Sequence, residues 1–168
     1  TARLLEALGD IEEQTDGLLL HSENLQALRE LSVSLKGRVQ CLCIDPPYNT
    51  GDDGFAYRDQ YRHSSWVSMM SNRFEAGRAL LSETGAVFVS VDDNEVKRLW
   101  FVMDEVFGSS NYLSSMVWKR RSASGMTSQP LSLDHEYLLV YARQIDEVRL
   151  HGLARKEDDY AHFDEKLK

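Results

Sequence analysis

The sequence predicts an α/β fold in which helices cover both faces of a mainly parallel sheet. Short apolar strands alternate with amphipathic helices over residues 17–107, and each strand is a continuous apolar run rather than an alternating one. Continuous apolar runs are typical of strands that are buried on both faces, as they are in parallel sheets. The 168 residues suffice for one domain with a sizeable core.

The individual elements follow from apolar spacing and from residues that start or stop helices. Helices are expected over residues 4–13, 23–35, 65–81 and 94–107. Strands are expected over residues 17–21, 39–44, 85–91, 112–119 and 135–142. Ser22 is the expected N-cap of the second helix, and Gly37 and Gly108 stop the second and fourth. The last two strands should form a hairpin around a Ser- and Gly-rich loop.

Composition limits the class of protein. A net charge of −8 argues against a chain that coats nucleic acid along its whole surface, although Lys119, Arg120 and Arg121 form a basic island. No apolar run approaches the roughly 20 residues that span a bilayer, so no membrane partner is expected. Cys41 and Cys43 share a predicted strand. We expect them on opposite faces as reduced, buried thiols of a cytoplasmic protein.

The strand over residues 39–44 runs into Asp45, Pro46, Pro47 and Tyr48. Each proline fixes its own φ at about −65° and lacks an N–H donor, and the residue before a proline is pushed out of the helical region. The strand must therefore stop at Asp45 and leave a stiff loop that holds a carboxylate, carbonyls and a ring in fixed positions. Ligands bind beyond the carboxyl ends of strands in such sheets, and this loop lies at one.

The loop suits methylation of an aromatic amine, such as that of adenine or cytosine. Such an amine is a poor nucleophile because its lone pair is delocalised into the ring. Asp45 can accept one amine hydrogen and stabilise the developing positive charge, and the Pro46 carbonyl can accept the other. Tyr48 can stack on a base rotated out of the duplex. No His or Cys cluster has metal-ligand spacing, so no metal is expected.

A simpler interpretation of Asp-Pro-Pro-Tyr is a turn that ends a strand over a buried tyrosine, because such sequences also occur by chance. The position of the motif after a buried strand in an α/β pattern favours the catalytic interpretation. An Asp45 sealed in the core, with no opening before it, would exclude that interpretation.

Several ordered motifs resemble those of the modification (Mod) subunits of type III restriction-modification systems. They occupy residues 19–28, 44–51, 64–66, 69–70, 87–95 and 135–142. Those subunits are β-class amino-group DNA methyltransferases, usually adenine-specific. The resemblance implies a Rossmann-like, S-adenosylmethionine-dependent fold that methylates the exocyclic amine of a flipped-out adenine at a specific DNA site. Methylation of the cytosine amine stays open, although Asp45 is the adenine-like choice.

The resemblance also implies roles for residues around the tetrapeptide 45–48, which it makes catalytic. Ser22 and Glu23 fall where the family places an acid near the adenosine of the cofactor. Asn49 and Thr50 are expected to flank the cofactor.

Three further features have two interpretations each. Asp92 and Asp93 either support the pocket or cap the helix that follows them. His135 matches a last-strand motif of the family, although a histidine at a strand start is more often structural. The basic residues 119–121 either contact DNA phosphate or form a solvated hairpin tip.

One family feature has no match, namely the glycine-rich Phe-x-Gly-x-Gly cofactor loop. We expect residues 1–142 to be the catalytic part of a methyltransferase domain and residues 143–168 a charged tail at the start of a target-recognition region. In the family's sheet, two central strands lie between those expected here over 17–21 and 39–44. An incomplete sheet with an unpaired strand edge, and an incomplete cofactor site, should result.

The resemblance implies double-stranded DNA as substrate, with a restriction subunit and a second modification subunit as partners. An alternative from another class is a non-catalytic remnant that only binds protein or DNA. A Rossmann dehydrogenase is not supported, because no Gly-x-Gly-x-x-Gly follows any strand.

Overall fold

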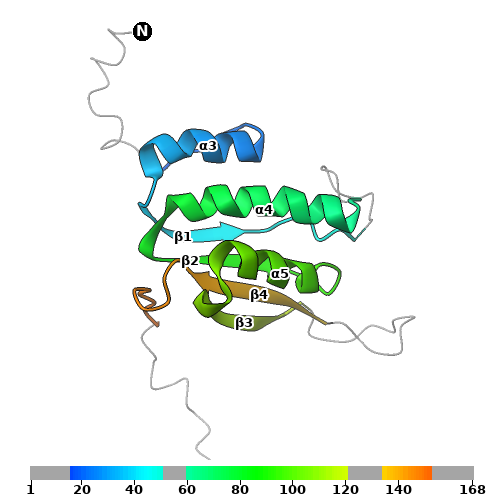
Figure 1. The fold of residues 1–168 in the computed structure, drawn as a ribbon. Helices are drawn as coiled ribbons and strands as arrows, with labels where there is room; N and C mark the ends of the chain where they lie inside the picture. The colour runs from blue at the N-terminus through cyan, green and yellow to red at the C-terminus, as the bar shows by residue number, and fades with distance from the viewer. Residues whose placement is uncertain (1–15, 51–59, 121–133, 153–168) are drawn as a thin grey trace, which may run out of the picture.

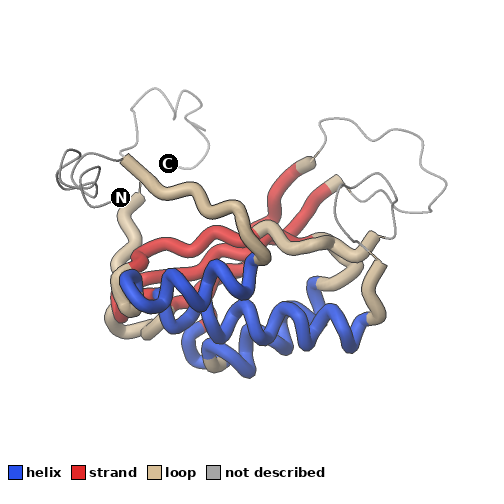
Figure 2. Tube along the Cα trace, turned by 90° about the horizontal axis from the view of Figure 1, so that it is seen from above, coloured by secondary structure: helices blue, strands red, loops and turns tan. Residues whose placement is uncertain are grey.

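The computed structural model describes residues 16–50, 60–120 and 134–152, in which three helices lie on one side of a four-stranded sheet (Figures 1 and 2). The strand order is β1-β2-β4-β3, with β1 and β2 parallel and the other neighbours antiparallel. In chain order the elements are α3 (Asn24–Leu35), β1 (Val39–Ile44), α4 (His63–Leu80), β2 (Leu81–Val91), α5 (Val96–Phe107), the 3-10 helix η1 (Ser109–Asn111), β3 (Tyr112–Lys119) and β4 (His135–Ala142).

The register brings four strand ends to one edge of the sheet. Val91 at the end of β2 pairs with Tyr137 near the start of β4, and Lys119 at the end of β3 pairs with His135. Because β1 runs parallel to β2, the loop after β1 leaves the sheet at this same edge. Side chains from all four strands can therefore meet at this edge. We call it the carboxyl edge, because β1, β2 and β3 end there.

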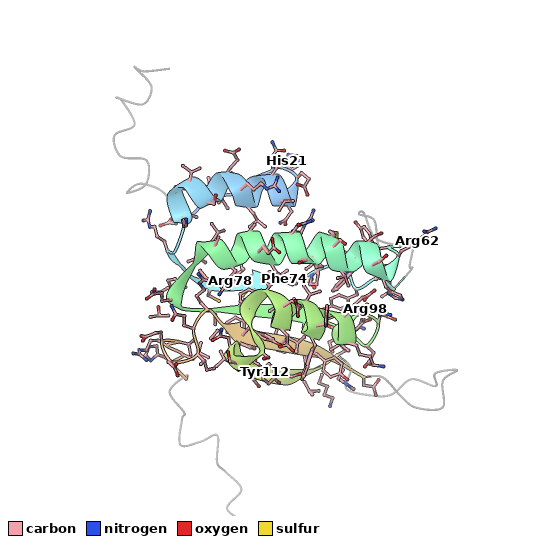
Figure 3. All side chains as sticks on the ribbon, viewed as in Figure 1. His21, Arg62, Phe74, Arg78, Arg98 and Tyr112 are labelled. Carbon is pink, nitrogen blue, oxygen red and sulfur yellow. The ribbon has the colours of Figure 1, made fainter. Side chains whose placement is uncertain are left out.

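The core lies between the sheet and helices α4 and α5. Phe74, which is labelled in Figure 3, is fully buried and packs edge-on against Phe107 with ring centroids 6.4 Å apart. Gly77 allows α4 to approach β1, because a methyl group on its Cα would lie 2.8 Å from Leu42 Cδ2. Close packing of α4 on β1 sets the position of the loop that follows β1.

Most of the expected elements are confirmed. Strands β1, β3 and β4 have the expected bounds, and β3 and β4 form the expected antiparallel hairpin. The helices α4 and α5 differ from expectation by one or two residues at their ends, and β2 begins four residues early. The sheet is mixed rather than mainly parallel, because the hairpin adds two antiparallel strands. Its helices in the described residues cover one face, not both.

Two expectations at the start of the described chain are wrong. Residues 17–21 form no strand, and Leu18 and Leu19 are 75% and 94% exposed. A strand needs a hydrogen-bonded neighbour, and β1 pairs only with β2 among the described residues. The N-cap of α3 is Glu23 rather than Ser22, because the Glu23 carboxylate reaches the Gln26 N–H.

The expectation for the cysteines is also wrong. Cys41 and Cys43 are both exposed, and their sulfur atoms lie 3.7 Å apart on the same face of β1. Residues two apart on a strand share a face. Within the described part of the chain, no helix covers that face of the sheet.

Other predictions fall outside the described residues, namely the helix over 4–13 and most of the Ser- and Gly-rich loop between the last two strands. The division at residue 142 stays a prediction. After β4 the chain returns to the start of β2, where the Arg143 and Arg149 N–H groups donate to Gly85 and Thr84 carbonyls. None of the helices in the described ranges is long and apolar enough to cross a membrane.

Strand β1 lies at the edge of the sheet formed by the described residues, which leads to a prediction about association. An exposed edge strand offers unpaired backbone groups to another chain, so the chain should self-associate as its concentration rises. Analytical ultracentrifugation should show an increasing weight-average mass. The variant Cys41→Lys, which adds a charge to the edge strand, should weaken this effect. A single monomer boundary at high concentration would contradict the prediction.

Candidate active site

Asp45 lies at the end of β1 and is exposed, at the mouth of a cavity. Its carboxylate Oδ1 accepts a hydrogen bond from Ser90 Oγ at 3.2 Å, and Ser90 is near the end of the neighbouring strand β2. The structure therefore confirms that Asp45 is not sealed in the core. One oxygen is oriented by β2, and the group as a whole remains accessible to a ligand.

The two prolines are fixed from the helical side of the sheet. Pro46 is buried, and the Pro47 carbonyl accepts a hydrogen bond of 2.8 Å from Trp66 Nε1. Trp66 is fully buried in the first turn of α4. Because a buried indole N–H needs a partner, this bond anchors the loop to the hydrophobic core.

Tyr48 is held at its hydroxyl end. The hydroxyl donates to Glu136 Oε2 at 2.9 Å, and Glu136 Oε1 lies 2.6 Å from Arg120 Nε. Burial raises the pKa of Tyr48 well above its usual range, and the Glu136 and Asp45 carboxylates add to this effect. The hydroxyl therefore stays protonated at neutral pH and keeps donating to Glu136, which limits rotation of the ring.

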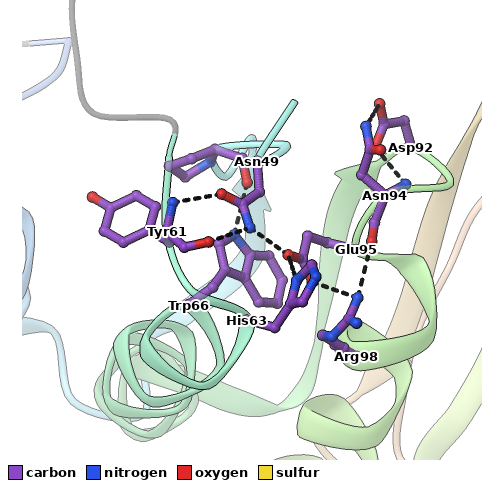
Figure 4. A network of polar contacts seen from close by, with 9 residues as sticks. Asn49, Tyr61, His63, Trp66, Asp92, Asn94, Glu95 and Arg98 are labelled. Carbon is purple, nitrogen blue, oxygen red and sulfur yellow. Dashed lines mark hydrogen bonds and ion pairs between the residues drawn. The ribbon is translucent and has the colours of Figure 1, made fainter. Parts of the chain in front are cut away.

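Asn49 has a left-handed backbone conformation, with φ of 59°. Its side chain bonds to Tyr61 at both ends: Nδ2 donates to the Tyr61 carbonyl at 3.0 Å and Oδ1 accepts from the Tyr61 N–H at 2.7 Å. Nδ2 also donates to Glu95 Oε1 at 2.6 Å. Figure 4 shows Asn49 at the centre of this network, which also includes His63 and Arg98. Asparagine is among the few residues that tolerate this backbone conformation.

A cavity of about 490 Å³ lies between α3, α4 and the end of β1. This volume is in the range of small-molecule sites. Its described lining is mainly apolar with a few polar groups: Asn24, Leu28, Leu42, Cys43, Ile44, Asp45, Pro46, Pro47, Tyr61, Met69, Met70, Arg73 and Gly77. Asp45 thus belongs both to the loop and to the cavity wall.

The residues expected near a cofactor have different surroundings. Glu23 reaches the cavity wall through Arg73, whose Nη2 lies 2.6 Å from Glu23 Oε1. The backbone N–H groups of Gln26 and Leu25 lower the pKa of Glu23, so it is ionised at neutral pH. Ser22 and Thr50 are exposed and are not among the described lining residues.

The side chain of Asn49 is engaged by Tyr61 and Glu95. A role for Asn49 beside a cofactor stays a prediction that would have to use its backbone.

The two acids after β2 differ in role. Asp92 accepts hydrogen bonds from the Asn94 backbone and side chain, which matches a cap of the turn before α5. Asp93 accepts from the Tyr137 hydroxyl at 3.1 Å, so it connects β2 to β4 at the carboxyl edge. His135 Nε2 lies 3.1 Å from the same hydroxyl, which favours a structural role for the histidine.

The basic residues lie at the same edge. Lys119 is exposed at the end of β3, Arg120 pairs with Glu136, and Arg121 lies outside the described residues. In the described ranges, no group of three or more His, Cys, Asp or Glu side chains is placed to hold a metal ion.

Sequence reasoning assigned no site role to four residues that hold the loop: Trp66, Ser90, Glu95 and Glu136. All four fall within the motifs that carry the family resemblance. No local sequence pattern predicts that these side chains point at one loop, because they come from α4, β2, the turn before α5, and β4.

An α/β sheet with an exposed acid, two prolines and a restrained ring beside a cavity defines an enzyme-like ligand site at a strand end. Residues 39–166 match the family model of the N6/N4 DNA methylases. Because the match covers more than half of the chain, the chain belongs to this DNA methylase family.

Three relatives show the range of the similarity. The StyLTI Mod subunit of Salmonella typhimurium, a type III restriction-modification enzyme, is 35% identical over 159 residues, which cover 78% of this chain and 24% of that subunit. The EcoP15I Mod subunit of Escherichia coli is 30% identical, with 78% and 25% covered. The type II methyltransferase M.KpnI of Klebsiella pneumoniae is 30% identical, with 90% and 37% covered. The chain therefore spans about a quarter of the two Mod subunits.

Solved structures support the same fold. M1.HpyAVI in complex with S-adenosylmethionine matches with a TM-score of 0.51 and 12% identity, covering 82% of this chain and 60% of that one. The cytosine-N4-specific PvuII DNA methyltransferase matches with a TM-score of 0.50 and 14% identity, covering 71% and 47%. At these identities the likeness shows the fold alone.

Proposed function

We propose that this chain is the catalytic portion of a site-specific DNA methyltransferase that modifies the exocyclic amine of adenine within a restriction-modification system. The observation that carries the proposal is the accessible Asp45 carboxylate beside the buried Pro46 and the restrained Tyr48, at the mouth of a cavity. The similarity to type III Mod subunits supports adenine as the base.

Each residue of the loop has a different role toward a flipped-out base. Asp45 accepts one amine hydrogen and stabilises positive charge as it develops on the nitrogen. The Pro47 carbonyl is engaged by Trp66, so we assign the second hydrogen to the Pro46 carbonyl. Tyr48 stacks on the base, and its bond to Glu136 keeps the ring in one orientation.

The lining of the cavity fits part of S-adenosylmethionine. Leu28, Ile44 and Met69 provide an apolar wall for a flat ring, and Asn24 and Arg73 provide polar groups on α3 and α4. When bound, S-adenosylmethionine supplies an activated methyl group. Glu23 would act from beside the cavity through Arg73. The family's glycine-rich loop has no match in this sequence, so these residues form only part of a cofactor site.

The wider setting follows from the same relatives. We infer that the whole protein acts on double-stranded DNA in the cytoplasm, together with a restriction subunit and a second modification subunit. A non-catalytic module that only binds protein or DNA is the alternative. Methyl-transfer assays of this chain and of a longer protein that contains it separate the two.

The first functional prediction concerns Asp45. In the longer protein, Asp45→Ala should lower the rate of labelled methyl transfer to DNA by about 10²–10⁴-fold, because the amine loses its acceptor. Ser90→Ala, which removes one hydrogen bond to Asp45, should cost about tenfold. Asp146→Asn, at an exposed acid near the opposite end of the sheet, serves as the control. Wild-type rates in Asp45→Ala would refute the proposal.

A second prediction concerns cofactor affinity. Because part of the site has no match here, residues 1–168 alone should bind S-adenosylmethionine weakly or not at all. Isothermal titration calorimetry measures this directly, with S-adenosylhomocysteine as a second ligand. Micromolar binding by this chain would contradict the prediction.

A third prediction concerns residues 119–121. If they contact DNA phosphates, changing Lys119, Arg120 and Arg121 to Gln in the longer protein should reduce the slope of log K against log salt by about one unit for each lost contact. Lys97→Gln, on the exposed side of α5, is the control. An unchanged slope would instead indicate a solvated hairpin tip.

A further inference from the structure

Glu95 is the one charged or polar residue that is buried among those the structure describes, with no exposed surface. It lies between the end of β2 and the start of α5, where it is the N-cap residue of α5. A buried carboxylate is costly unless several donors compensate it. The donors around Glu95 therefore show how the fold compensates this buried carboxylate.

The donors around Glu95 come from three separate segments. Oε1 lies 2.6 Å from Asn49 Nδ2 and 2.7 Å from His63 Nδ1, and Oε2 lies 3.3 Å from Arg98 Nη1 (Figure 4). Asn49 directly follows the tetrapeptide, His63 begins α4, and Arg98 is in the first turn of α5. A carboxylate only accepts hydrogen bonds, so all three partners point their donors at Glu95.

Asn49 connects Glu95 to the loop, because it bonds to the Glu95 carboxylate and directly follows Tyr48 in the chain. Its amide also bonds to the backbone of Tyr61 in both directions. Glu95 and Tyr61 together hold the residue that follows Tyr48, while Trp66 holds the Pro47 carbonyl. The Trp66 indole and the Glu95 carboxylate therefore add two restraints to those that Ser90 and Glu136 place on Asp45 and Tyr48.

We propose that Glu95 is a positioning residue for methyl transfer, which holds the Asp45–Tyr48 loop in its active geometry through the side chain of Asn49. The role in methyl transfer rests on the proposed function. The restraint on the loop can be measured by itself, without an activity assay. Asn49 then serves as the link between loop and carboxylate. If the loop moved by even less than the length of a bond, the Asp45 and Pro46 oxygens that accept the amine hydrogens would be misplaced.

The indole N–H of Trp66 reports on this restraint in the chain as it is. Its bond to Pro47 should give a shifted resonance that exchanges slowly with solvent. Trp100 and Trp118 are 40% and 67% exposed, so their indole signals should exchange fast. The amide of the buried Val89 in β2 reports on opening of the whole core, against which Trp66 exchange is compared.

A charge swap tests the link. Asn49→Asp removes the donor and places a second carboxylate beside Glu95. The Trp66 indole should then exchange about tenfold faster than wild type relative to Val89, the equivalent of one lost hydrogen bond to a charged group. Adding Glu95→Gln to this variant restores the hydrogen bond with its direction reversed, because the new amide at position 95 can donate to the new carboxylate at position 49. The double variant should return to within about threefold of wild type.

The control is Asp104→Asn. Asp104 is an acid within α5 that, like Glu95, accepts a side-chain hydrogen bond, here from the Tyr141 hydroxyl at 2.7 Å. It should leave the ratio of Trp66 to Val89 exchange unchanged. Should Asn49→Asp fail to fold, Glu95→Gln alone should still raise the ratio, because the amide cannot satisfy Arg98 and Asn49 together.

Two results would overturn the inference: Trp66 exchange that rises only in step with Val89, or a double variant no closer to wild type than Asn49→Asp. Either would make Glu95 a contributor to overall stability rather than to loop geometry. Neither result would affect the methyl-transfer assay of Asp45→Ala. A failure of that assay would likewise leave the Trp66 result standing, so the two proposals fail separately.

Discussion

The hydrogen bond between the Trp66 indole and the Pro47 carbonyl is the contact on which the site depends. Two prolines remove the N–H donors that would otherwise tie this segment to a neighbouring strand. Side chains must then position the loop, and a buried indole is a rigid donor. Because Trp66 is part of the core between α4 and the sheet, the loop takes its position from the hydrophobic core.

The same edge of the sheet concentrates negative charge around that loop. Asp45, Asp92, Asp93, Glu95 and Glu136 all lie at the ends of β1, β2 and β4. Each has a defined partner in Ser90, Asn94, Tyr137, Asn49 or Arg120. Of these five acids, Asp45 is the one that lies among the described lining residues of the cavity. The hydrogen bonds and ion pairs of Asp93, Glu95 and Glu136 connect neighbouring segments at this edge of the sheet.

The two faces of the described sheet differ in exposure. The helical side of the sheet buries a continuous core, whereas Cys41, Cys43 and Trp118 remain exposed. Strand β1 pairs on one side only within the described ranges. The loop after β1 is nevertheless held from the buried side, by Trp66 of α4 and by Glu95 before α5.

Local chemistry made part of this structure predictable. Proline geometry after a continuous apolar run ended β1 at Ile44, and a glycine stop ended α5, because both effects act within a few residues. The alternation of strands and helices predicted the α/β class, and an accessible Asp45 was expected and is confirmed. A strand over 17–21 was expected from the same apolar pattern and is absent, because a strand also needs a partner that local sequence does not supply.

The remaining features were decided by tertiary structure. Glu95 and Glu136 are 46 and 88 residues from Asn49 and Tyr48, with which they form hydrogen bonds. No spacing rule relates residues so far apart. Their contacts exist because the register brings the ends of β1 and β2 and the start of β4 to one edge. The sequence alone determined that β1 ends in a stiff loop with an acid, two prolines and a tyrosine, because proline geometry is local. The packing of α4 and α5 on the sheet decided which side chains hold that loop in place.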